Sequence, residues 1–313
     1  MARRFLCTAF ASFGRHQLQR KKRMPDNDNK NDDKKKFIDF NQQVIDEFRA
    51  HHGRVGGPFE GGRLLLLTTT GARTGTPHTN PVAYFPDGGE RVLVIASAGG
   101  SPKHPDWYHN LLTHPRVTVE SGVFTYEAEA VVLAGEEREQ AWARAVEADP
   151  GWAEYQRKTE RILPVVALHA ITDGGPGKIN ASSPGEAIKV VHDAFRRELA
   201  LIRKEMAAGN GTLGAQLRVN CLTFCQGLHN HHTGEDTMMF PFLADRRPEA
   251  NPALKRLSEE HERIAALVAE LRRALADEDP AAARAEVERL TLDLEAHLTY
   301  EEQELIPLLD APA

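Results

Sequence analysis

Four segments in the second half of the chain carry apolar residues at helical spacing, and each of these stripes is interrupted by a histidine. The histidines are His192, His231, His261 and His297. In two segments a glutamate follows one helical turn later, at Glu235 and Glu301, so both side chains share one helix face. Because burying an ionised carboxylate without a partner is very costly, the pattern predicts a cation between the helices. Helix bundles hold pairs of iron or manganese ions with such nitrogen and oxygen donors on facing helices.

A single histidine in an apolar stripe is more often a hydrogen-bonded core residue than a metal ligand. Four of them, one in each segment and two with a companion glutamate, favour the metal interpretation. The pattern needs no thiolate, which argues against a structural zinc site. Cys221 is expected in the core, whereas Cys225, His229 and His232 lie off the stripe and are expected at the surface or beside the ligands.

The same stripes predict an all-α architecture for residues 184–310. They fit four helices separated by sequences rich in Gly, Asn, Asp and Pro, which are turn-forming residues. The predicted helices cover residues 184–208, 212–240, 251–276 and 280–306. The second stripe is expected to continue through Met238 and Phe242. Four helices of this length with short loops predict an up-and-down four-helix bundle.

Three sequences in this region, HNHHTGEDTMMFP, EEHERI and HLTYEEQELIP, closely resemble the hemerythrin-like HHE cation-binding domain over about residues 184–308. The resemblance implies a non-haem di-iron centre, with ligands at His192, His231, Glu235, His261 and His297. In the hemerythrin pattern the last carboxylate is Glu302, whereas the stripe favours Glu301, so both remain candidates. The oxygen-carrying pattern also has a second histidine on the third helix, where this chain has Ala265. That difference counts against reversible oxygen carriage and leaves redox chemistry, sensing of O2 or NO, peroxide handling and iron binding open.

Residues 37–172 have a different pattern, which predicts an α+β domain. A helical spacing over 37–50 precedes six short segments rich in β-branched residues and bounded by Gly, Pro or Asp. These segments indicate a mostly antiparallel sheet or a small barrel. Further helical patterns lie near 103–113 and 135–160.

Two of the predicted strands end in loops that could hold an anionic cofactor. Small residues at a strand end, such as Gly75, let backbone amides approach an anion. Arg73 and Lys103 add positive charge, and Tyr84 and Trp107 offer flat apolar faces to a ring system. Tight turns and core packing explain the same residues equally well. No dinucleotide-binding glycine fingerprint follows these strands, so a Rossmann site is not expected here.

This half of the chain also resembles the deazaflavin-dependent nitroreductase family, through about residues 38–170. The resemblance is carried by VIDEFRAHHGRVGGPFEGGRLLLLTTTGARTGTPHTNPVAY, ASAGGSPKHPDWYHNLLTHPRVTVE and ARAVEADPGWAEYQRKTERILPVVAL. It implies a split β-barrel, related to FMN-binding flavin reductases, that binds coenzyme F420 and passes a hydride to quinones, nitroaromatic compounds or other electrophiles. The family's cofactor positions fall on Arg73, Thr74, Gly75, Ser97, Gly99, Gly100, Ser101, Lys103, Pro105, Trp107 and Asn110. In the family, the segment that holds Tyr155 closes over the substrate, so the proton for the product could come from Tyr155, the candidate catalytic residue, or from solvent. FMN is the alternative cofactor.

Two further segments complete the predicted organisation. Residues 1–36 carry eleven Lys or Arg against four Asp and are expected to form a disordered basic tail. Peripheral contact of this tail with an anionic membrane surface, or with the polyglutamate tail of F420, is an open option. Residues 173–183 are rich in Gly, Asn and Ser and are expected to form a linker between the two domains.

The composition sets limits on function. The net charge of −6 argues against a nucleic-acid partner, and no apolar run is long enough to span a membrane. Three cysteines do not make a disulfide framework, so a cytoplasmic location is expected. The family resemblance implies a possible homodimer. The sequence thus predicts an F420H2-dependent reductase of quinones or nitro compounds with a di-iron domain. The alternative is a redox or gas sensor that binds F420 and iron without turnover.

Overall fold

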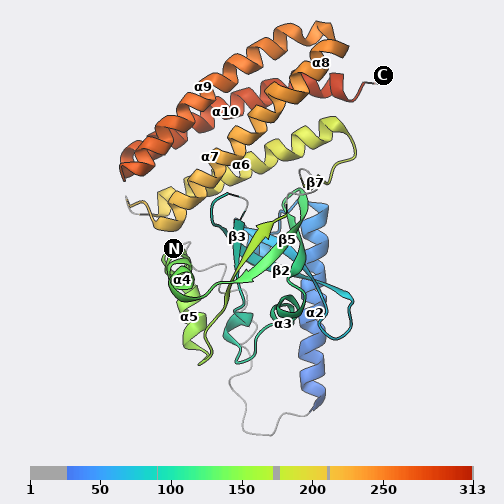
Figure 1. Ribbon diagram of the computed structural model, residues 1–313, viewed down its shortest axis with the longest axis vertical. Helices are drawn as coiled ribbons and strands as arrows, with labels where there is room; N and C mark the ends of the chain where they lie inside the picture. Colours follow the sequence, from blue (N-terminus) through green and yellow to red (C-terminus); the bar gives the residue numbers. More distant parts are fainter. Residues whose placement is uncertain (1–26, 90, 172–176, 210–211, 312–313) are drawn as a thin grey trace. The chain divides into compact units, whose positions relative to one another are not determined.

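The computed structural model describes residues 27–89, 91–171, 177–209 and 212–311. This part of the chain forms two compact units, coloured along the sequence in Figure 1. The first unit holds the described residues up to Lys178 apart from the turn 86–89, and the second holds that turn and the residues from Ile179 onward. Each unit has its own hydrophobic clusters, so each has its own folding core.

The first unit is built on a closed barrel of strands. The strands are β1 (Leu64–Thr70), β2 (Pro77–Pro86), β3 (Arg91–Ile95), β4 (Arg116–Ser121), β5 (Phe124–Val132) and β6 (Val165–Ala170). Their order is β4-β1-β2-β3-β6-β5, and antiparallel pairing between β4 and β5 closes the sheet on itself. The predicted barrel is therefore confirmed. A short strand, β7 (Lys178–Ile179), pairs with β5 within the segment predicted as a linker.

Strand β1 shows why the sequence contains a run of four leucines. Leu65 and Leu67 belong to the cluster inside the barrel. Leu64 and Leu66 face the other way and pack with Phe48 of helix α2 (Asn27–Ala50). A strand that is buried on both faces needs an apolar residue at every position, so it shows no alternation.

Helix α2 begins at Asn27, well before the predicted start at residue 37. It extends into the segment that the composition marks as a disordered tail, so that prediction is wrong for residues 27–36. The rest of the predicted tail, residues 1–26, lies outside the described residues. The sequence has no apolar stripe before Phe37, and helical spacing therefore gives no signal for the extension.

Three further helices cover the barrel: α3 (Asp106–Thr113), α4 (Gly135–Ala148) and α5 (Gly151–Arg157). The single helical pattern predicted near 135–160 is thus two helices. They pack Ala141, Trp152 and Tyr155 against Leu93 of β3 and Ala167 of β6. Short 3-10 helices cover Gly57–Phe59 (η1) and Ala98–Gly100 (η2).

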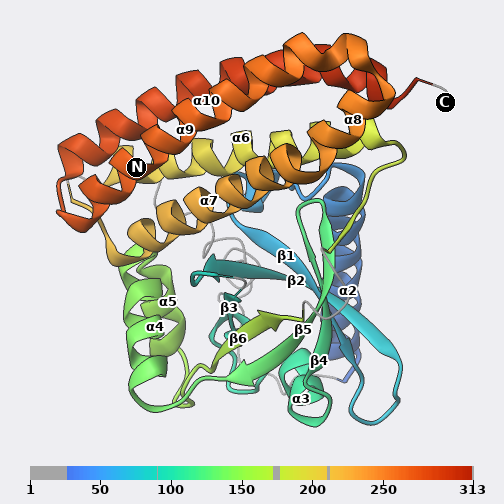
Figure 2. The same cartoon turned by 45° about the horizontal axis from the view of Figure 1, so that its top comes forward.

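The second unit consists of four long helical stretches lying side by side (Figure 2). They are α6 (Pro184–Ala208); α7 (Ala215–Gly234) with η3 (Glu235–Met239) and α8 (Phe240–Arg246); α9 (Asn251–Ala276); and α10 (Pro280–Leu309). A short turn of helix, η4 (Pro248–Ala250), precedes α9. Caps mark two of the predicted starts, because Ser183 and Asp279 accept amide hydrogen bonds at the N-termini of α6 and α10. Within the described part of the chain, no helix has both the length and the apolar character needed to cross a membrane.

The second stretch contains one turn of π-helix, η3, between α7 and α8. The Phe240 N–H bonds to the Glu235 carbonyl, five residues back rather than four. The following residue is Pro241, which has no N–H and would clash with the carbonyl four residues earlier in an α-helix. The extra residue shifts the buried face, so Met238 is 71% and Phe242 50% exposed. The predicted continuation of the stripe through these two residues is therefore wrong.

Candidate metal centre and cofactor loops

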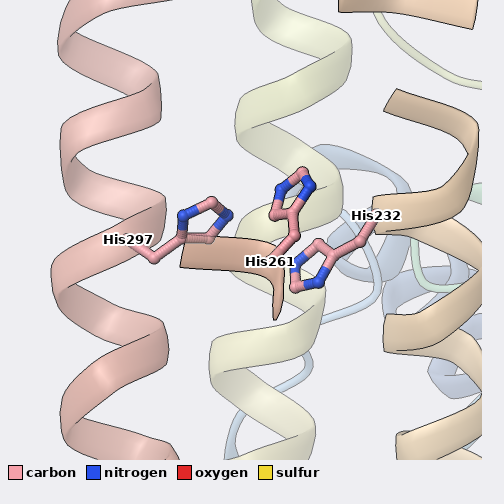
Figure 3. Close-up of side chains that lie close together, drawn as sticks. All are labelled: His232, His261 and His297. Atoms are coloured by element: carbon pink, nitrogen blue, oxygen red, sulfur yellow. The ribbon is translucent and has the colours of Figure 1, made fainter. Parts of the chain in front are cut away.

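Two groups of potential metal ligands lie inside the helical unit. The first group is His232 from α7, His261 from α9 and His297 from α10 (Figure 3). The second group is His192 from α6, His231 from α7, Glu235 from η3 and Glu301 from α10. Within each group the candidate ligand atoms lie within 4.8 Å of one another.

Glu235 connects the two groups. Its Oε1 lies 3.0 Å from Nε2 of His231 in the second group. Its Oε2 lies 3.5 Å from Nε2 of His261 in the first. The two oxygens of one carboxylate therefore face two different sets of nitrogen donors.

Glu301 makes the corresponding connection from α10. Its Oε2 lies 3.5 Å from Nε2 of His192 and 3.6 Å from Nε2 of His297. The neighbouring candidate, Glu302, is placed differently, because its Oε1 accepts a hydrogen bond of 2.6 Å from Arg196. The structure thus separates the two carboxylates that the sequence left open: Glu301 lies within the cluster and Glu302 outside it.

Many of these buried atoms have no hydrogen-bond partner among the described residues. They are Nε2 of His192, His231, His232, His261 and His297, and both carboxylate oxygens of Glu235 and Glu301. Buried polar groups in folded proteins are nearly always satisfied, and an unpaired buried carboxylate is especially costly. Five imidazole nitrogens with two carboxylates are a donor set that suits iron or manganese. The residues present therefore fit a pair of cations.

Three of the histidines are held by a carboxylate near the other ring nitrogen. The pairs are His192–Glu302, His261–Asp236 and His297–Glu260, with Nδ1-to-oxygen distances of 3.0, 3.0 and 3.1 Å. Arg196 and Arg256 in turn donate to Glu302 and Glu260. A carboxylate at Nδ1 favours the tautomer in which Nε2 has a lone pair, and it fixes the orientation of the ring.

Burial sets the charge state of the cluster. It lowers the pKa of His297 to about 4, against the opposing effect of Glu260, and it also lowers the pKa of His231. Burial raises the pKa of Glu235, and the neighbouring Glu301 raises it further. A neutral imidazole has the lone pair that a metal ion needs, and a cation would stabilise two adjacent carboxylates as anions.

The sequence pattern misplaced one residue of α7. Cys225 is 0% exposed within the core cluster, so the expectation of a place at the surface or beside the ligands is wrong for it. His232 is 6% exposed and its ring stacks on that of His261, so it lies beside the predicted ligands, which was one of the two expected places. His229, which shared that expectation, is exposed. A stripe treats the buried face as a single line, whereas a helix surrounded by neighbours also buries residues next to that line.

The first candidate cofactor loop joins β1 to β2. Gly75 adopts a φ of +66°, and the Ala72 N–H donates a 3.0 Å hydrogen bond to Oδ1 of Asn110 in α3. Arg73, Thr74 and Gly75 are exposed. The loop therefore presents a cation and free surface to solvent while Asn110 fixes its shape from beneath.

The second candidate loop leads from β3 through η2 to α3. Gly99 and Gly100 have φ values of +64° and +83°, which favour glycine. A Cβ at Gly100 would lie 2.8 Å from the main-chain oxygen of Tyr155, so the loop lies directly against α5. The Lys103 side chain is exposed, and the main-chain N–H of Lys103 donates to Oγ of Ser101 at 3.2 Å. Ser97 and Pro105, the remaining predicted positions, are half-buried.

Arg161 fixes the second loop and was missed by the sequence pattern. Its guanidinium donates to the main-chain oxygens of Ala96, Ser97 and Ser101 at 3.1, 2.7 and 2.8 Å. It also lies 3.1 Å from Nδ1 of His104. Burial lowers its pKa, but a guanidinium remains charged in proteins. A lone arginine outside the loops has no spacing signal, and only the fold brings it to these carbonyls.

The aromatic candidates lie mainly in the core. Trp107 is 6% exposed within the barrel cluster, and Tyr84 packs half-buried against that cluster. Tyr155 is 3% exposed and makes an edge-on ring contact of 6.0 Å with Trp152. Core packing therefore accounts for Trp107 and Tyr155 in this structure, and a catalytic role for Tyr155 stays a prediction.

Comparison with known proteins follows the same division of the chain. Residues 41–170 match the family model for F420H(2)-dependent quinone reductase, and residues 183–309 match the hemerythrin HHE cation binding domain. An F420H(2)-dependent quinone reductase of Mycobacterium tuberculosis is 37% identical over 125 residues, which are 39% of this chain and 83% of that protein. A solved F420-H2 dependent reductase is 42% identical over 34% of this chain and 94% of that one, with a TM-score of 0.32.

The protein has two domains. The first is a split barrel with two glycine-bearing loops, and the second is a helical domain of the cation-binding type, with a cluster of histidines and glutamates. The chain belongs to the F420H2-dependent quinone reductase family, and its second domain is a hemerythrin HHE domain. Both resemblances seen in the sequence are thereby confirmed. The family description names quinone reduction, so the nitroreductase type is a narrower expectation that stays untested.

Proposed function

We propose that the chain is an oxidoreductase that uses F420H2 to reduce a quinone, and that its helical domain holds two iron ions. The observation that carries the reductase part is the family match across the barrel, on a chain whose two candidate loops keep their exposed cations and positive-φ glycines. Nitro compounds are the second class of acceptor. F420 is the proposed cofactor, and FMN is the alternative that a split barrel also allows.

The residues of the loops have separable roles in this proposal. F420H2 supplies the hydride when it is bound, so the protein's task is to bind, to orient and to exclude water. Arg73 and Lys103 are placed to attract the anionic end of the cofactor, because both are exposed beside the loops. Gly99 and Gly100 set the turn of the second loop, because their positive φ values favour glycine. Arg161 acts as a positioning residue, since it holds the carbonyls on the other side of the same loop.

Equilibrium binding tests the cofactor assignment. We expect F420 to bind the intact chain more tightly than FMN, and Arg73→Ala with Lys103→Ala to weaken F420 binding by about 10- to 100-fold, as loss of charge-assisted hydrogen bonds would. Arg157→Ala on α5 is a matched control, because Arg157 is exposed and lies outside both loops. Tighter binding of FMN than of F420 would show that the cofactor assignment is wrong.

The iron part of the proposal rests on the unsatisfied nitrogens and the two shared carboxylates. The ions would add one-electron redox chemistry and an affinity for small ligands. Because His192 and Glu301 are 0% exposed, the molecules best suited to reach this centre are small, such as O2 or NO. Iron analysis of the purified chain tests this, with two iron ions per chain expected and less than one contradicting a dinuclear centre.

A further inference from the structure

We propose that His232 is a metal ligand, which joins His261 and His297 on one of the two ions. This inference rests on the proposed iron centre and adds a ligand that the HHE pattern of the sequence does not include. The pattern of oxygen carriers takes a further histidine from the third helix, and this chain has Ala265 there. His232 would supply that nitrogen from the second helix instead.

The surroundings of His232 are those of a ligand rather than of a packing residue. Its ring stacks on that of His261, with centroids 4.1 Å apart and planes 9° apart, and lies 5.2 Å from the ring of His297. Figure 3 shows the three rings gathered from three different helices. Nε2 of His232 is buried and has no hydrogen-bond partner among the described residues. A buried imidazole nitrogen without a partner is costly, and a cation shared with His261 and His297 would satisfy it.

The geometry of α7 explains how two consecutive histidines serve two ions. Successive residues of an α-helix point about 100° apart. His231 lies beside Glu235 and His192, whereas His232 lies beside His261 and His297. The two rings are 5.6 Å apart, so each can contribute to a different group.

The third helix cannot supply the missing nitrogen in this fold. Ala265 is exposed, and the buried residue at that level of α9 is Ile264, at 2% exposure. A histidine at position 265 would therefore not face the interior, where a second ligand from α9 would have to lie. Among the described residues, the two groups together still hold five histidines, three in one and two in the other, because α7 contributes two of them.

The inference predicts that loss of His232 weakens the binding of one ion and leaves the binding of the other unchanged. We would compare the unaltered chain with His232→Ala, His232→Asn and His229→Ala, an exposed histidine of the same helix. Iron content after dialysis and competition with a chelator measures retention, and the absorption spectrum of the Co2+-loaded protein reports the donor set. We expect two ions per unaltered chain, and release of one of them about 10- to 100-fold more readily in both His232 variants. His229→Ala should match the unaltered chain.

The outcomes separate this inference from the proposed function. Two ions retained equally well in both His232 variants, with an unchanged Co2+ spectrum, would overturn the ligand assignment and leave the iron centre intact. An unaltered chain without iron would contradict the iron centre itself. Circular dichroism of the metal-free proteins checks folding, and His232→Asn decides the matter if the smaller alanine disrupts the bundle.

Discussion

Glu235 and Glu301 each reach histidines that come from different helices, and this shared contact links the two halves of the metal cluster. At the scale of single residues, histidine and carboxylate types at helical spacing are enough to locate such a centre. The helical spacing favours Glu301, whereas the hemerythrin pattern places the last carboxylate at Glu302, so the sequence leaves both as candidates. The fold decides the ranking by pairing Glu302 with Arg196.

Replacing each carboxylate by its amide tests that ranking. Glu301→Gln should leave less than one iron per chain, because an amide in this position supplies no charge to either ion. Glu302→Gln should retain both ions but bind them about 10-fold more weakly, as expected for a group that orients His192 from behind. Iron analysis by mass spectrometry measures both. Equal losses in the two variants would show that the distinction is incorrect.

Arg161 offers a second test at this scale. Arg161→Ala should weaken F420 binding by about 10- to 100-fold, because three main-chain carbonyls of the loop lose a charged donor. Arg157→Ala, the exposed neighbour, is the control. Fluorescence titration of F420 against each variant gives the comparison, and unchanged affinity in Arg161→Ala would exclude a positioning role.

At the scale of elements, the sequence predicts best where one pattern controls the structure. Residues 184–208 and 251–276 are helical as predicted, because their stripes lie between turn-forming residues. The prediction is wrong at Met238 and Phe242, because the π turn that precedes Pro241 adds a residue that a constant period of 3.6 residues cannot represent. Glycine patterns, in turn, indicate that a loop turns sharply but not which element lies against it.

Gly100 is an example of a glycine whose packing partner the sequence does not reveal, and its close contact with α5 can be tested. Gly100→Ala should lower the free energy of unfolding by about 2 to 4 kcal/mol, since a Cβ meets the Tyr155 carbonyl at 2.8 Å in addition to the strain at φ +83°. Gly135→Ala is the matched control, because its φ is +56° and no atom lies within 4 Å of the added Cβ. Strain alone should cost Gly135→Ala about 1 kcal/mol. Urea unfolding measures both, and equal effects would argue against close packing of η2 on α5.

At the scale of the whole molecule, the chain joins two units with separate cores, and the histidine cluster lies in the helical unit. The histidine cluster makes the stability of the helical unit depend on pH. Burial holds the pKa of His297 at about 4 in the folded protein, whereas a histidine of the unfolded chain binds its proton near pH 6.5. The unfolded state therefore takes up the proton first as pH falls. Stability from this group is present above pH 6.5 and is lost between there and about pH 4.

The iron-free protein should accordingly lose on the order of 3 kcal/mol of stability from His297 alone between pH 7 and pH 4. His297→Gln should remove most of that dependence. Urea unfolding followed by circular dichroism at a series of pH values measures how the free energy of unfolding changes with pH. The same pH dependence in His297→Gln as in the unaltered chain would contradict a neutral His297, whereas Glu235 and Glu301, whose pKa values are raised, act on both proteins alike.

The measurement that tests the central claim most directly is anaerobic oxidation of F420H2 by the intact chain, followed by the absorbance of the oxidised deazaflavin with and without menadione. The account predicts rapid oxidation that depends on both the protein and the quinone, with a nitroaromatic compound tested in parallel to rank the acceptors. Tight binding of F420H2 without quinone-dependent oxidation would contradict the reductase function and favour a sensor that binds F420 and iron.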